Sequence, residues 1–243
     1  MQGYPQQAID YFVEIAIGAQ FGQTLTIHKW TQDVLIQVIG QATGEDKDVL
    51  DRVATELSGL VQAQGIRIDF VGSSPTTKLY FASPARFARI EPHYVPPNTA
   101  FFWSQWDATS IYASTILIAS EGITQHKRDH HIVAMLAKNL GLMKKSSAEP
   151  TSIFFNGENE STELAGIDRL VVQMLYNPAI ENGMTADDVR AVLPVDSSAG
   201  QEFLRGTAGQ SPGAPFYCPQ CGTMLKRTDQ YCYVCGAPVE GTA

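Results

Sequence analysis

All four cysteines of this chain lie in one short segment near its end, and this clustering constrains the fold more than any other feature. Cys218 and Cys221 form one CxxC pair, and Cys232 and Cys235 form a second. Each pair can present two thiolates to one tetrahedral metal ion. The glycine after each pair allows a tight turn that brings backbone amides towards the sulfurs. The rest of the chain must therefore build its core without cysteine.

The segment 215–240 resembles the short zinc-ribbon family, in which two CPxCG-like knuckles are joined by a hairpin-length connection. The resemblance implies one structural zinc ion held by Cys218, Cys221, Cys232 and Cys235, with no coordination position left for substrate or water. Two disulfides are the alternative, which the lack of a signal-peptide pattern disfavours. Residues 196–214 are small, polar and glycine-containing, so we expect a flexible linker.

Composition excludes some classes of function. The chain has 243 residues and a formal net charge of −8, with 44% hydrophobic and 17% charged residues, which suits one globular domain plus a small appendage. The negative charge disfavours general nucleic-acid binding, because such binding needs cationic side chains that displace counterions from phosphates. No apolar run is long enough to cross a bilayer, and we expect a cytoplasmic protein without membrane contact.

Periodicity predicts an α+β domain over residues 5–195, with a mixed sheet packed against helices. Helices are expected at 6–18, 46–64, 162–175 and 187–193, and another should end at Gly141. Strands are expected at 24–30, 33–39, 66–71, 78–82 and 111–119. The first two are predicted to form a hairpin or one bulged strand.

The segment 86–107 is rich in proline and aromatic residues, and we expect an irregular excursion there. Its aromatic side chains are candidates for peptide binding: Phe101, Phe102, Trp103 and Trp106. The alternative is that they cover the edge of the sheet. The second interpretation is favoured, because contiguous exposed aromatic surface is uncommon.

The helix that ends with Leu140-Gly141-Leu142 resembles the active-site helix of metzincin-like zinc peptidases. In those enzymes HExxHxxGxxH supplies three imidazoles to zinc and a glutamate to the attacking water. Alignment on Gly141 places four residues at the ligand and base positions: Ala134, Met135, Lys138 and Lys144. None can serve, since a lysine must first lose its proton to bind zinc. The HKRDH register at 126–130 also fails, because Lys127 replaces the base. We therefore expect no catalytic residue.

From Tyr11 to Met184 the chain resembles an uncharacterised bacterial zincin-like family. The matching motifs are FVEIAIGAQFG, IHKW, an arginine–histidine stretch, LGL, SIF, ID, LY and GM. The resemblance implies a zincin-like mixed sheet packed with helices. Members of that family carry a glutamate pair where this chain has Ala134 and Met135, so the fold is expected without the chemistry.

Three histidines near the start of the same helix form a second candidate metal site: His126, His130 and His131. A solvated helix start is the alternative, with Arg128 and Asp129 as a surface charge pair. Asp168 lies on an otherwise apolar helix face, and we expect it to hydrogen-bond either Arg128 or the loop at 152–154.

These patterns favour a non-catalytic zincin-like domain that binds a peptide or protein, with the zinc ribbon as a second interaction module. One alternative is an active zinc metallohydrolase that uses an atypical histidine set. Another is a ribbon-mediated nucleic-acid-associated protein. The ribbon's charges, on Lys226, Arg227, Asp229 and Glu240, sum to zero, so counterion release would be small and a protein contact is favoured.

Overall fold

The computed structural model describes residues 3–18, 25–108, 110–157 and 159–196, and the backbones of 216–217 and 224–225. The chain divides into two compact units, Met1–Ser197 and Ser198–Ala243. In the second unit the described strands are β6 (Phe216–Tyr217) and β7 (Met224–Leu225), which pair antiparallel. The four ribbon cysteines and most of the expected linker lie outside the described residues.

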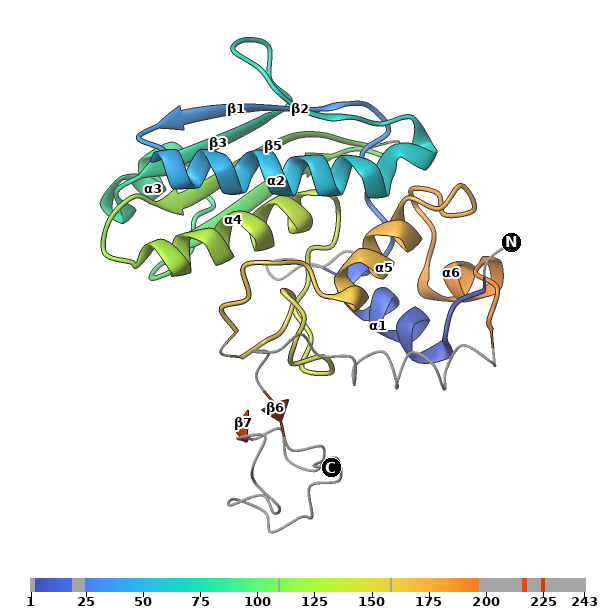
Figure 1. The fold of residues 1–243 in the computed structure, drawn as a ribbon. Coiled ribbons are helices and arrows are strands. Elements are labelled where there is room, and N and C mark those ends of the chain that lie inside the picture. Colours follow the sequence, from blue (N-terminus) through green and yellow to red (C-terminus); the bar gives the residue numbers. More distant parts are fainter. Residues whose placement is uncertain are drawn as a thin grey trace. The chain divides into compact units, whose positions relative to one another are not determined.

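A five-stranded mixed sheet forms the centre of the first unit, in the order β2-β1-β3-β5-β4 (Figure 1). The strands are β1 (Val34–Gly40), β2 (Ile68–Phe70), β3 (Thr77–Ala82), β4 (Ala100–Trp106) and β5 (Ile111–Ala119). Strands β2, β1, β3 and β5 are parallel, whereas β4 runs antiparallel to β5 at one edge. The prediction of an α+β fold with a mixed sheet is confirmed.

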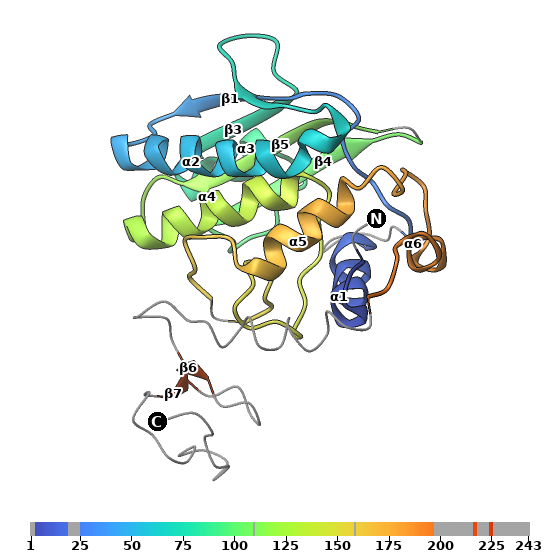
Figure 2. The same cartoon turned by 45° about the vertical axis from the view of Figure 1, so that its right-hand side comes forward.

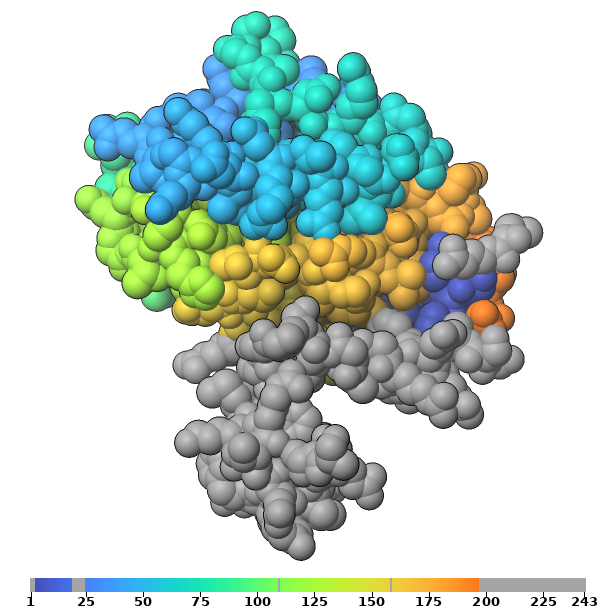
Figure 3. All heavy atoms as spheres, in the orientation of Figure 1, coloured from blue at the N-terminus to red at the C-terminus, as the bar shows by residue number. Residues whose placement is uncertain are grey.

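Helices α2 (Gly44–Val61) and α4 (Gln125–Asn139) lie side by side across one face of the sheet, and Figure 3 shows their side chains in contact. A further layer contains α1 (Gln6–Ala16), α5 (Gly166–Leu175) and α6 (Ala186–Val192) (Figure 2). A short turn η1 (Gln62–Gln64) extends α2 and ends at Gly65. None of the described helices is long and apolar enough to span a membrane.

The opposite face of the sheet is covered by η2 (Pro84–Arg86), α3 (Phe87–Ile90) and the segment that follows them. Phe87 packs in a buried cluster with Phe101 of β4 and Leu117 of β5. Leu117 is three residues from Ser114, whose side chain lies on the α4 side, and alternation along a strand puts the two on opposite faces. The sheet is therefore covered on both sides where this cluster lies, at the ends of β3 and β5.

Two sequence expectations were wrong. Residues 24–30 were expected to pair with 33–39 in a hairpin or to continue it as one bulged strand, but only Val34–Gly40 is a strand. Ile27 instead exchanges backbone hydrogen bonds with Gly183 and Met184. The segment 86–107 was expected to be irregular, but its last part is the regular edge strand β4. The first error arises because the pairing partners of Ile27 lie far away in the sequence, whereas β4 pairs with the next strand and was hidden by the prolines that precede it.

The segment 27–30 joins the ends of several elements. Trp30 is fully buried and its Nε1 donates to the carbonyl of Asn139 at 2.7 Å. Lys29 Nζ donates to the carbonyls of Leu175 (3.1 Å) and Ile180 (2.6 Å), at and just after the end of α5. A cation satisfies the free carbonyls of a helix C-terminus and interacts favourably with its dipole. This segment therefore fixes α4 and α5 relative to the sheet.

Gly141 ends α4 against this segment, as the sequence predicted. Its φ is +119°, a conformation that favours glycine, and a Cβ at this position would lie 2.1 Å from the carbonyl oxygen of His28. Neither the backbone conformation of Gly141 nor the neighbouring segment at His28 leaves room for a side chain.

We expect Gly141→Ala to lower the free energy of unfolding by about 2 to 5 kcal/mol, combining a strained φ with overpacking. Urea unfolding followed by tryptophan fluorescence measures this change, because all three tryptophans, Trp30, Trp103 and Trp106, belong to the first unit. Gly59→Ala is the control. Gly59 lies inside α2 with no atom near its added Cβ, so alanine should stabilise by about 0.5 to 1 kcal/mol. Equal changes in the free energy of unfolding for Gly141→Ala and Gly59→Ala would contradict the close packing of Gly141 against His28.

Candidate functional site

Helix α4 carries most of the candidate residues, and its N-terminus is firmly fixed. Thr124 caps the helix by accepting a hydrogen bond from the backbone N–H of Lys127 at 3.1 Å. Arg128 Nε lies 3.1 Å from Oδ1 of the fully buried Asp46 of α2, and its Nη1 donates to the carbonyl of Ser120. The expected surface pair of Arg128 with Asp129 was therefore wrong. Arg128 instead links the starts of α2 and α4 to the end of β5.

The three histidines of α4 have different surroundings. His126 is exposed, whereas His130 and His131 are mostly buried. His130 Nδ1 lies 2.8 Å from the carbonyl oxygen of Ser161, and His131 Nε2 lies 2.9 Å from Oγ1 of Thr99, next to β4. Across the described residues, no group of three or more histidine, cysteine or carboxylate side chains is placed to hold a metal ion.

Burial affects the protonation of both inner histidines. It lowers the pKa of His130, and it lowers the pKa of His131 to about 3, with smaller contributions from nearby positive groups. His131 is therefore neutral at physiological pH and binds Thr99 as a neutral imidazole. This state suits a structural link between α4 and the edge strand.

The four aromatic residues of β4 divide between the core and the surface. Phe101 is 4% exposed and belongs to the cluster under α3. Phe102, Trp103 and Trp106 remain partly exposed. Trp103 stacks on the ring of His93 with centroids 4.0 Å apart, and Trp106 lies against His28 at 4.8 Å. The structure thus supports core cover for Phe101 and leaves three aromatic side chains accessible along the edge strand.

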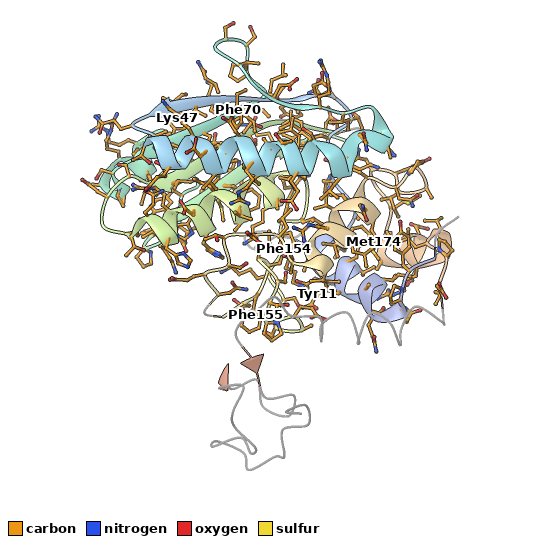
Figure 4. The ribbon with its side chains drawn as sticks, viewed as in Figure 1. Tyr11, Lys47, Phe70, Phe154, Phe155 and Met174 are labelled. Atoms are coloured by element: carbon orange, nitrogen blue, oxygen red, sulfur yellow. The ribbon has the colours of Figure 1, made fainter. Side chains whose placement is uncertain are left out.

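A buried polar network fixes the loop that follows α4. Ser152 Oγ donates to Asp168 Oδ1 at 2.5 Å and accepts a hydrogen bond from Tyr11 Oη at 2.6 Å. Asp168 Oδ2 also accepts from the backbone N–H groups of Ile153 and Ala165. The expected contact of Asp168 with the loop at 152–154 is confirmed. In Figure 4, Tyr11 and Phe154 lie on the side of the unit away from Lys47 of α2.

This network is structural in character. Burial raises the pKa of Asp168 to about 6, although its hydrogen bonds oppose that shift. Burial also raises the pKa of Tyr11 well above its usual range. Every hydroxyl and carboxylate oxygen in the network is engaged with another described group, so none is available to attack a substrate.

Lys138 is a buried residue whose environment the sequence did not reveal. It lies on α4, is 2% exposed, and has no hydrogen bond or ion pair within the described part of the chain. Burial, with a contribution from Lys145, lowers the pKa of Lys138 to about 7. Lys29 is likewise buried, but its ammonium group donates to the carbonyls of Leu175 and Ile180, and these hydrogen bonds account for its burial. The sequence alignment put Lys138 at a metal-ligand position but did not predict that it is buried, because lysine is rarely buried in folded proteins.

Acidification should test the environment of His131. Because its pKa is lowered in the folded state, the unfolded chain binds the proton first, and stability falls as the pH drops from about 6.5 towards 3. Between these pH values the free energy of unfolding should fall less steeply in His131→Gln than in wild type, by up to about 1.4 kcal/mol per pH unit. Urea unfolding between pH 7 and 4 measures it.

His126→Gln is the matched control on the exposed side of α4, and it should leave the pH dependence unchanged. If wild type and His131→Gln lost stability in parallel on acidification, the buried neutral state of His131 would be refuted.

Comparisons with known proteins give two family matches and similarities to solved structures, among them two structures of myroilysin. Residues 217–239 match the family described as "zinc-ribbon domain". No curated protein matches the chain. A structure titled "Structure of myroilysin" is 10% identical with a TM-score of 0.36, covering 61% of this chain and 95% of that one. Another, titled "Crystal structure of myroilysin", is 11% identical with a TM-score of 0.28, covering 81% and 78%.

Both structural similarities are too weak to say what this chain does. The second family match is far more extensive, because it spans residues 5–195 and therefore nearly all of the first unit. The chain belongs to the family described as "Protein of unknown function (DUF2927)", with a zinc-ribbon domain at its C-terminus.

Proposed function

We propose that this protein binds an extended segment of a peptide or protein partner along the edge strand β4, without catalysing a reaction on it. The observation that carries this proposal is the position of β4, which ends the sheet and pairs with no strand on its outer side within the described residues. An unpaired edge presents backbone donors and acceptors that can add a further strand from another molecule.

The register identifies the backbone groups that would receive the partner. The N–H of Ala119 donates to the carbonyl of Thr99, so Thr99 begins the series of residues bonded to β5. Alternate residues of an antiparallel strand turn their backbone groups to the other side. Ala100, Phe102 and Ser104 therefore direct their N–H and C=O groups towards the free edge.

Side chains beside this edge suit recognition of a peptide. Phe102, Trp103 and Trp106 are partly exposed, and the ring contacts of Trp103 with His93 and of Trp106 with His28 hold the two indoles in place. Aromatic residues with restricted motion supply contact area at a low entropic cost. Helix α4 borders the same strand through the contact between His131 and Thr99.

The residues of α4 support binding rather than hydrolysis. Ala134 and Met135 offer no general base, and the alignment on Gly141 puts the buried Lys138 at the position of a metal ligand in a zincin-like helix. We infer a zincin-like scaffold from the LGL, SIF and GM motifs, and the contacts of Gly141, Ser152 and Met184 give each motif a structural role. In this proposal the scaffold persists as a binding surface.

A zinc ribbon at residues 217–239 completes the proposed organisation, as a second interaction module. Four thiolates would close the coordination sphere of one zinc ion, which suits a structural metal. Because so small a unit has little core of its own, zinc binding would also fold it.

Metal analysis of the purified protein tests the ribbon. We expect one zinc per chain by plasma emission, lost on Cys218→Ser and on truncation after Val195, because both remove thiolate ligands. The tryptophan fluorescence of the first unit should be the same in all three proteins. Zinc that remained in the truncated chain would contradict the proposal and point to a metal site in the first unit.

Selection from a random peptide library on immobilised protein tests the edge strand. We expect Ala100→Pro to weaken the selected peptides about tenfold, because loss of one backbone donor removes about 1.4 kcal/mol. Proline at the start of an edge strand leaves the pairing with β5 intact. Ala100→Thr keeps the N–H group and is the control. Equal affinity of both variants would exclude binding along β4.

A further inference from the structure

A row of polar side chains crosses the sheet beneath α4. Thr77 of β3, Ser114 of β5 and Ser104 of β4 lie opposite one another in register, so their side chains share one face. Thr77 Oγ1 and Ser114 Oγ are 2.8 Å apart, and Asn139 Nδ2 of α4 donates to Thr77 Oγ1 at 3.2 Å. The row therefore runs from Asn139 to the edge strand.

Both ends of this row have unused hydrogen-bonding groups. Ser104 is 5% exposed and Asn139 is 1% exposed, and neither Ser104 Oγ nor Asn139 Oδ1 has a hydrogen-bond partner in the described part of the chain. Buried polar atoms are nearly always paired in folded proteins. Within the described residues, these two buried atoms are therefore available to bind a polar group of a ligand.

Lys138 lies next to this row and faces the same edge. Helix α4 contacts both β4 and β5 and follows β5 through a short turn, so it runs in the same direction as β4 (Figure 2). His131 reaches Thr99 just before β4 begins. Lys138 is seven residues further, on the same helix face, and Asn139 beside it contacts the row that ends at Ser104. Helical geometry therefore puts Lys138 on the side of α4 that faces β4.

We propose that Lys138 and Ser104 form a receptor for a carboxylate group of the ligand that binds along β4. The ammonium and the hydroxyl group both donate, which matches an anion with several acceptor lone pairs. Asn139 Oδ1 accepts, and it suits an N–H group next to that carboxylate or a bridging water. This inference rests on the proposed function, and it narrows the partner class to peptides with an acidic side chain or a free C-terminus placed at Ser104.

The other charged groups near Lys138 favour an incoming anion. His130 and His131 of α4 interact with Lys138, and Lys145 in the next loop lowers its pKa. Strand β4 carries no titratable residue. Glu160 acts on the two histidines in the opposite sense, but among the described residues Lys145 is the charged group that shifts the pKa of Lys138 itself. A bound carboxylate would stabilise the protonated form of Lys138 and raise its pKa.

Acetate is the probe for this site, because it supplies the carboxylate alone. Proton–carbon NMR of protein labelled at the lysine ε-carbon follows the ammonium titration, and Lys138→Met identifies the signal. We expect a midpoint near pH 7 in chloride, which rises by on the order of one pH unit when acetate replaces chloride at equal ionic strength. Ser104→Ala should reduce this rise, since it removes one donor.

The exposed Lys47 of α2 is the matched control, and its titration should not respond to acetate. If the Lys138 midpoint did not move with acetate, or moved equally in Ser104→Ala, the receptor would be refuted. Acetate can bind to Lys138 without any peptide. If acetate shifted the Lys138 midpoint but the library yielded no peptide that binds along β4, the carboxylate receptor would stand and only the proposed function would be rejected.

The selected peptides then show the source of the carboxylate. Each peptide is compared with its C-terminal amide and with glutamine or asparagine in place of its acidic residues. We expect one of these changes to lower the affinity of the peptide for the wild-type protein. The same change should leave its affinity for the Lys138→Met variant unaltered. Selected peptides that tolerate both changes would show that the ligand brings no carboxylate to Lys138, and would overturn the proposal.

Discussion

The first unit depends on the contact between residues 27–30 and the ends of two helices. Gly141 approaches the carbonyl of His28 so closely that only a hydrogen atom fits between them, and Trp30 bonds to the last residue of α4. Lys29 binds the carbonyls at the end of α5. Helix α4 also packs on β4, β5 and α2, and α5 packs on α1 and α2. The segment 27–30 ties the ends of both helices to the sheet, and so helps to determine where the edge strand β4 lies relative to α4.

With α4 fixed in this way, different faces of the helix make different contacts. Asn139 faces the sheet, Arg128 binds Asp46 of α2, and His131 reaches the edge strand through Thr99. Helical periodicity then puts Lys138 on the side of His131. The edge strand and this helix face meet because β4 is the last strand of the sheet and α4 packs against both β4 and β5.

Sequence reasoning succeeded where the signal is local. The helix over 46–64 was visible from its periodicity and from Gly65, and the end of α4 from Gly141. It failed where partners are distant, because nothing near Ile27 shows that it pairs with Met184. Strand β4 was hidden by the prolines before it. The sequence placed Lys138 at a ligand position of the helix but showed neither its burial nor the role of Ser104, because burial of a polar residue is decided by tertiary packing.

The two buried lysines show why the surroundings of Lys138 call for a ligand. Each buries a long apolar stem, which is favourable, and each must either lose its proton or gain acceptors for its ammonium group. Lys29 gains two carbonyls from the end of α5, so its burial is explained within the fold. Lys138 gains none from the described residues, and its pKa falls to about 7. A group that is half protonated near neutral pH is poised to bind an anion with uptake of a proton, so affinity for a carboxylate should fall as the pH rises through the pKa of the free site.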